Sequence, residues 1–158
     1  WLMEKVVLPT VAFVGRLFPN LTVQGLGDPN YAYSLLKQYK GEWEFDTNWK
    51  MIFGHPKKAG WINAIQEAQK TVQKGIGLDC PVLVMSSNKS FPETKEWNNE
   101  YLSSDIVLDI HDIQKYGQKL GNYVTRDTIQ NGIHDLILSE KDSRDHVYRT
   151  VFDWLPGK

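Results

Sequence analysis

Cysteine is almost absent from this chain, since Cys80 is the only one among its 158 residues. One thiol cannot form an internal disulfide, and no grouping of Cys and His has the spacing of zinc ligands. The sequence therefore excludes a disulfide-stapled scaffold, and it predicts neither a bound metal nor a cofactor. We expect Cys80 to be a small packing residue that leads into a strand rather than a reactive nucleophile.

The chain also lacks an excess of either charge. Its 18 Lys and Arg residues are balanced by 19 Asp and Glu residues, for a net charge of −1. No cluster of basic residues is present to attract a polyanion, so nucleic acid is not expected as a partner. The hydrophobic share of 41% and the charged share of 23% are ordinary for a globular protein, and the length suffices for one domain.

A long hydrophobic run is missing as well. The apolar stretch at residues 6–18 contains Pro9 and Arg16, and it is shorter than the roughly 20 residues that span a bilayer. Glu4 and the lack of a small-residue cleavage site argue against a signal peptide. We therefore expect a protein that does not span a membrane and that lies in the cytoplasm. Because the chain begins at Trp1 without a methionine, we also expect it to be part of a longer protein.

Residues 1–58 show no regular periodicity and contain many aromatic residues and Pro/Gly breaks. Asp28-Pro29 is typical of an N-cap followed by a first helical turn, and it predicts a short helix through Leu36. The segment 41–46 alternates polar and aromatic residues, which predicts an extended piece.

From Ala59 onward the pattern becomes regular. Apolar residues at helical spacing predict a helix that ends at Gly75 and Gly77. The unbroken apolar run 81–85 predicts a strand buried on both faces, as in a parallel sheet. A long polar loop at 86–104 follows, and loops of that length in compact domains are usually functional or mobile.

The last third of the chain predicts a helix over 113–120 and a strand over 123–129. A turn at Asn131-Gly132 follows, and then a final helix that is capped by Asp142 and runs to Leu155. The order strand, helix, strand, helix indicates an α/β fold. Two strands are too few for a doubly covered parallel sheet, so we expect the rest of the sheet to come from elsewhere.

This arrangement resembles the last third of the α/β-hydrolase fold, in its serine aminopeptidase and monoacylglycerol-lipase-like (lysophospholipase-like) branch. The matching pieces are the strand PVLVM at 81–85, the run DIVLD at 105–109, the sequence GIHDL at 132–136 and the closing helix to Leu155. The resemblance implies that residues 59–158 are the C-terminal part of the hydrolase core. It implies that residues 1–58 are the cap, or lid, which such enzymes insert before these strands.

In that family the triad runs serine, acid, histidine along the chain. The resemblance implies that His134 is the general base toward the serine hydroxyl and then the general acid toward the leaving group. Alone, a loop histidine would more often cap the next segment.

The acid is expected shortly after the penultimate strand, where residues 86–90 contain no carboxylate. If the long loop is an insertion, Asp105 takes this place, 29 residues before His134, and would hold the tautomer of the imidazole. Asp109 is the alternative acid, unless it serves as a helix N-cap.

The nucleophile is missing, because the pattern G-x-S-x-G occurs nowhere in the chain. The elbow serine and the oxyanion hole would lie on an upstream half of the same protein, which is the expected partner. This chain alone should be inactive, and joined to that half it should hydrolyse a small ester or lipid-like substrate. The aromatic residues of the cap fit an apolar acyl pocket as a group: Phe13, Phe18, Tyr31, Tyr33, Trp43, Phe45, Trp49 and Phe53.

Other interpretations remain open. A peptidase, a dehalogenase or an epoxide-opening enzyme would share the fold and differ in the elbow residue. A non-catalytic interaction protein would keep the fold after losing the triad, which the polar loop at the usual acid position favours. A small stand-alone α/β binding domain is the third possibility.

Overall fold

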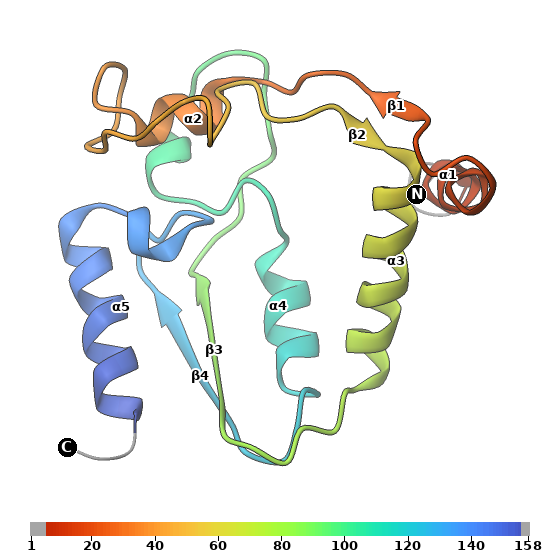
Figure 1. The fold of residues 1–158 in the computed structure, drawn as a ribbon. Coiled ribbons are helices and arrows are strands. Elements are labelled where there is room, and N and C mark those ends of the chain that lie inside the picture. Colours follow the sequence, from red (N-terminus) through yellow and green to blue (C-terminus); the bar gives the residue numbers. More distant parts are fainter. Residues whose placement is uncertain (1–5, 156–158) are drawn as a thin grey trace.

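The computed structural model describes residues 6–155, so Trp1 and Glu4, used above, lie outside it. The elements are, in order, α1 (Leu8–Leu17), β1 (Thr22–Gln24), α2 (Asn30–Leu35), β2 (Lys57–Lys58), α3 (Ala59–Lys74), β3 (Val82–Ser87), the 3₁₀ helix η2 (Asn99–Leu102), α4 (Ile110–Gly117), β4 (Val124–Ile129), the 3₁₀ helix η3 (Leu136–Leu138) and α5 (Lys141–Trp154). The chain is therefore a mixed α/β protein with a small parallel sheet (Figure 1).

The centre of the fold is the parallel pair β3–β4, which confirms the two predicted strands. Its register runs from Val82 opposite Val124 to Ser87 opposite Ile129. Helix α4 connects the strands and packs against β3 at Gly117, where an added Cβ would lie 2.9 Å from a methyl group of Val84. Helix α5 lies on the other side of the pair, along β4 (Figure 1).

Strand β3 is less buried than the sequence predicted. Val82 to Met85 are only half-buried, and Ser86 and Ser87 at the end of the strand are buried. Among residues 6–155, β3 has no strand neighbour besides β4. A parallel strand is covered on both faces only where the sheet and its helices continue beyond it, so the faces near the open edge stay accessible.

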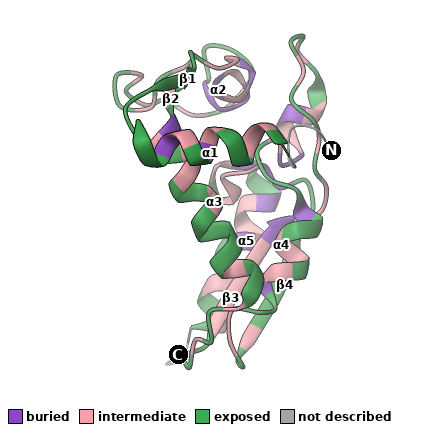
Figure 2. Cartoon of the chain, turned by 90° about the vertical axis from the view of Figure 1, so that its right-hand side faces the viewer, coloured by how far each residue is buried: buried purple, intermediate pink, exposed green. Residues whose placement is uncertain are grey.

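The N-terminal segment forms two attachments. Helix α1 crosses the start of α3 at Gly15, where an added Cβ would lie 2.2 Å from the Ala59 carbonyl oxygen. Strand β1 pairs with β2 in antiparallel orientation. Figure 2 shows the outer faces of α1 and α3 exposed to solvent. Helix α2 instead lies over the loops that follow β3 and β4 (Figure 1).

Several element boundaries differ from the sequence-based expectations. Helix α4 begins at Ile110 rather than 113, because the Asp109 side chain caps it by accepting the His111 N–H at 2.8 Å. Glu140, not Asp142, is the N-cap of α5, and Asp142 lies in the first turn, where a carboxylate favours the helix dipole. Residues 41–46 form no strand and make one bridge, between Leu36 and Trp43.

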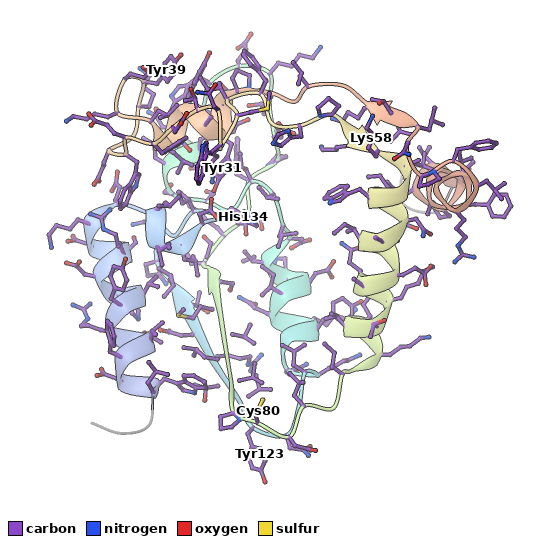
Figure 3. The ribbon with its side chains drawn as sticks, viewed as in Figure 1. Tyr31, Tyr39, Lys58, Cys80, Tyr123 and His134 are labelled. Carbon is purple, nitrogen blue, oxygen red and sulfur yellow. The ribbon has the colours of Figure 1, made fainter. Side chains whose placement is uncertain are left out.

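Two further findings concern Cys80 and the lengths of the helices. Cys80 is exposed, so it is not the packing residue we predicted, and it lies at the opposite end of the strands from His134 (Figure 3). None of the helices within residues 6–155 has the length and apolar character needed to cross a membrane.

Candidate active site

Two loops meet at the carboxyl ends of β3 and β4. Because the strands are parallel, the segments that leave them emerge at the same edge of the sheet, where α/β proteins usually bind ligands. The segment after β3 carries Asp105, and the segment after β4 carries His134. The topology thus brings together two residues that lie 29 positions apart in the sequence.

His134 contacts the carboxylate of Asp105 directly. Its Nδ1 lies 3.1 Å from Oδ1 and 3.2 Å from Oδ2. The Asp105 side chain is only 4% exposed, whereas that of His134 is 29% exposed. Nδ1 is hydrogen-bonded to Asp105, and Nε2 has no hydrogen-bond partner within residues 6–155. This leaves one ring nitrogen of a partly accessible imidazole available to an incoming group.

Asp105 is fixed by its own backbone neighbours. Its Oδ1 accepts the N–H groups of Val107 at 2.8 Å and Leu108 at 2.9 Å. Its own N–H donates to the Lys89 carbonyl at 3.0 Å. Burial opposes the ionisation of Asp105, but the hydrogen bond with His134 and the backbone N–H groups of Leu108 and Val107 outweigh it and lower its pKa. Asp105 is therefore a charged, oriented acceptor for the imidazole.

The alternative acid, Asp109, lies in a different setting. Its carboxylate is used to cap α4, and it makes no hydrogen bond to His134 in the described part of the chain. Of the two candidate aspartates, the fold brings only Asp105 into contact with His134.

The His134 loop is held at both ends. Asn131 adopts a left-handed conformation, with φ at 54°, and its N–H donates to Asn88 Oδ1 at 2.9 Å. The buried N–H of Ile133 donates to Ser139 Oγ at 3.0 Å.

The hydrogen bond with Asp105 raises the pKa of His134, and burial opposes that rise. The charges of Asp105 and Asp135 raise this pKa further, and Lys50 lowers it.

A second cluster adjoins His134, and the sequence analysis missed it. Asp135 Oδ2 accepts a hydrogen bond from the Tyr31 hydroxyl at 2.7 Å and pairs with Lys50 Nζ at 2.7 Å. The Tyr31 ring meets the imidazole edge to face, with centroids 6.3 Å apart, and Figure 3 shows it directly beside His134. No sequence signal connects these residues, since Tyr31 and Lys50 precede Asp135 by 104 and 85 positions.

Further contacts hold residues 28–50 over the two loops. We call these residues, which are part of the predicted cap at 1–58, the cap segment. The Trp43 indole N–H donates to the Leu138 carbonyl at 2.8 Å, and the Arg144 guanidinium lies 4.8 Å from the Trp43 ring. The Asn30 side-chain amide donates to the Thr94 carbonyl at 3.1 Å. The cap segment therefore contacts both the loop that carries the acid and the loop that carries the histidine.

The eight aromatic residues predicted to line an acyl pocket divide into three groups. Tyr33 and Phe45 are half-buried. Tyr31 and Trp43 bind the loops below them, as described above. Phe13, Phe18, Trp49 and Phe53 are exposed, with Trp49 87% accessible. A hollow of about 590 Å³ borders Asp105 and is lined by residues 88–92 and 105–111.

The pair His134–Asp105 can take up and return a proton, but it needs a group to act on. No serine in the described range hydrogen-bonds to His134, and no cluster of His, Cys, Asp and Glu within that range has the makings of a metal site. No known protein-family model matches this chain, and no curated protein matches it either.

Proposed function

We propose that this chain is the C-terminal part of an α/β-hydrolase, in which Asp105 and His134 are the acid and base of a serine-hydrolase triad. The observation that carries the proposal is the contact between His134 Nδ1 and the buried Asp105 carboxylate, made where two parallel strands end. The same order, acid after one strand and histidine after the next, is what the family resemblance implies.

The mechanism follows from which ring nitrogen is engaged. With Nδ1 donating to Asp105, the lone pair of a neutral imidazole is at Nε2, which accepts the proton of a serine hydroxyl as that oxygen attacks an ester carbonyl. Asp105 keeps this tautomer and stabilises the imidazolium that forms. Nε2–H then protonates the departing alcohol, which leaves the acyl group on the serine. A water molecule, deprotonated by Nε2 in the same way, attacks this acyl-enzyme and releases the carboxylic acid product.

The serine and the oxyanion hole must come from an upstream half of the same protein, because the chain has no G-x-S-x-G sequence. The open edge of β3 supports this proposal, since one more parallel strand would cover it. The substrate class we propose is a small carboxylic ester or a lipid-like ester. The cytoplasm remains the expected location, and fractionation of cells that make the complete protein would test it.

The non-catalytic alternative draws its support from the polar loop at the usual acid position, and the path of that loop favours the catalytic proposal instead. That loop is ordered around Tyr101, whose side chain is fully buried and whose hydroxyl donates to the Thr94 carbonyl at 2.9 Å. The loop also delivers Asp105 to His134, as a functional triad requires.

The decisive experiment uses the complete protein and, as the control, the half-buried His146, which pairs with another carboxylate. We expect wild type to hydrolyse p-nitrophenyl esters and to react with a fluorophosphonate probe. In His134→Ala, kcat/KM should fall about 10³-fold or more, because the base is lost. His146→Ala removes the same side chain from α5 and should stay within about two-fold of wild type. A wild-type protein with neither hydrolysis nor labelling would refute the proposal.

The upstream half has a separate test in the 158-residue chain itself. Two strands with an open edge bury too little surface to fold firmly, so we expect low helicity and no cooperative thermal transition by circular dichroism. Adding the upstream half as a second polypeptide should restore both. A stable monomer with a sharp transition would count against a missing half and in favour of a stand-alone domain.

A further inference from the structure

The cluster of Tyr31, Lys50 and Asp135 takes no part in the proton transfers described above, yet it adjoins the base. Asp135 Oδ2 receives both the Tyr31 hydroxyl and Lys50 Nζ, and the Asp135 N–H in turn donates to the Tyr31 oxygen at 3.2 Å. The side chains of Lys50 and Asp135 are 42% and 37% exposed, so solvent screens their ion pair only in part. Two cap residues are thus bonded to the residue directly after His134.

The charges around His134 come from three parts of the chain. The loop after β3 contributes the Asp105 carboxylate, the histidine's own loop contributes Asp135, and the cap segment contributes the Lys50 ammonium. Tyr31 carries no charge at physiological pH, like an ordinary tyrosine, and burial and its hydrogen bond to Asp135 raise its pKa further. The positive charge of Lys50 therefore offsets the negative charge of Asp135, one of the two carboxylates that raise the pKa of His134.

We propose that Lys50 and Tyr31 are positioning residues for His134. They fix Asp135 and neutralise it, so that among residues 6–155 Asp105 is the only uncompensated carboxylate beside the base. This inference rests on the proposed function, since it concerns how the base is kept ready. An imidazole that faces two uncompensated carboxylates binds its proton more tightly, and a protonated imidazole has no lone pair to accept the serine proton. Because Lys50 and Tyr31 belong to the cap segment, the position of that segment affects the fraction of His134 that is unprotonated.

Substitutions of opposite charge give a test that a purely structural role cannot imitate. In the complete protein, the pKa of His134 is followed by NMR of labelled histidine, with the His134 signal assigned by its loss in His134→Gln. Lys50→Met leaves Asp135 uncompensated and should raise this pKa. Asp135→Asn removes a negative charge and should lower it. The double variant should return it close to the wild-type value.

Activity gives a second readout of the same charges. In Lys50→Met the acid limb of the kcat/KM profile should move to higher pH, so that kcat/KM at pH 6 falls roughly two- to five-fold more than at pH 8. Lys50→Arg keeps the charge and should retain the wild-type profile. Lys37→Met is the matched control, because Lys37 lies in the same cap segment and pairs with exposed Glu44.

The outcomes separate the two proposals. Shifts of the same sign in Lys50→Met and Asp135→Asn, or no shift in either, would overturn the inference. If Lys50→Met does not fold, Lys50→Gln gives the same charge change with a polar side chain. If the wild-type protein shows no ester hydrolysis, the proposed function fails, and the NMR titrations still decide whether Lys50 offsets Asp135 beside His134.

Discussion

Two histidine–carboxylate pairs occur within residues 6–155, and the same two side-chain types are used in different ways. His134 meets Asp105 through Nδ1, at the carboxyl ends of the parallel strands. His146 on α5 meets Asp127 on β4 through Nε2, at 3.0 Å. Asp127 is also bound by the Thr150 hydroxyl at 2.6 Å.

The comparison shows that position and ring nitrogen, rather than the pairing itself, distinguish a candidate base from a structural contact. His146 uses Nε2 on Asp127, and that carboxylate also binds Thr150 on the same helix. This pair joins α5 to β4. His134 uses Nδ1 and has no hydrogen-bond partner at Nε2 within residues 6–155, while the backbone N–H groups of Val107 and Leu108 hold Asp105 in place.

The largest expected effect is on catalysis at the acid. Asp105→Asn should lower kcat of the complete protein by about 10³- to 10⁴-fold, because an amide no longer fixes the imidazole tautomer or stabilises its charged form. Asp127→Asn, in the other pair, should leave kcat within about two-fold. Steady-state ester hydrolysis measures both.

The runner-up acid supplies a closer control. Asp109→Asn should also keep kcat within about two-fold, since Asn caps a helix as well as Asp does. If kcat falls equally in Asp105→Asn and Asp109→Asn, Asp105 is not the specific triad acid. The contrast between the two histidine–carboxylate pairs then no longer holds.

The next effect is on stability of the histidine loop. Ser139→Ala should lower the free energy of unfolding by about 1–3 kcal/mol, because the buried N–H of Ile133 loses its acceptor. It should also lower kcat, since this bond shapes the loop that carries His134. Urea unfolding and ester hydrolysis of the same preparation measure the two losses, and a normal kcat at reduced stability would show that the loop does not position the base.

A smaller effect is expected in the other pair. Thr150→Val keeps the shape of the side chain and removes its hydrogen bond to Asp127, which should cost about 1 kcal/mol of unfolding free energy. Here kcat should stay unchanged. A loss of activity larger than about two-fold would mean that the α5 pair contributes to catalysis after all.

The smallest effect is a dependence of stability on pH. The pKa of His134 is raised in the folded protein, first by its hydrogen bond to Asp105, so its contribution to stability is complete below the unfolded pKa of about 6.5. That contribution disappears as the pH rises through the folded pKa. Urea unfolding should therefore show wild type more stable than His134→Gln at pH 5.5, with a smaller difference on the alkaline side. A difference that grows with pH would contradict the assigned ion pair.

The elements of the second half follow from the sequence because each has a local cause. Apolar spacing and the glycine after Lys74 define α3, whose C-cap Gly75 has φ at 100°. The run 81–85 and the β-branched residues of 124–129 predict the two strands, of which β3 continues to Ser87. The predicted start of α4 at residue 113 was wrong. Asp109, which the sequence also offered as a helix N-cap, accepts the His111 N–H and starts the helix at Ile110.

The sequence by itself determined the α/β character and the two parallel strands, because periodicity and chain order carry that information, whereas His134 and Asp105 were implied by the family resemblance. Only the tertiary structure decided that Asp105 rather than Asp109 meets the imidazole, and that Tyr31 and Lys50 join Asp135. Such contacts depend on how the cap segment lies across the strand ends, and no spacing along the chain encodes the meeting of side chains that lie 85 and 104 residues apart.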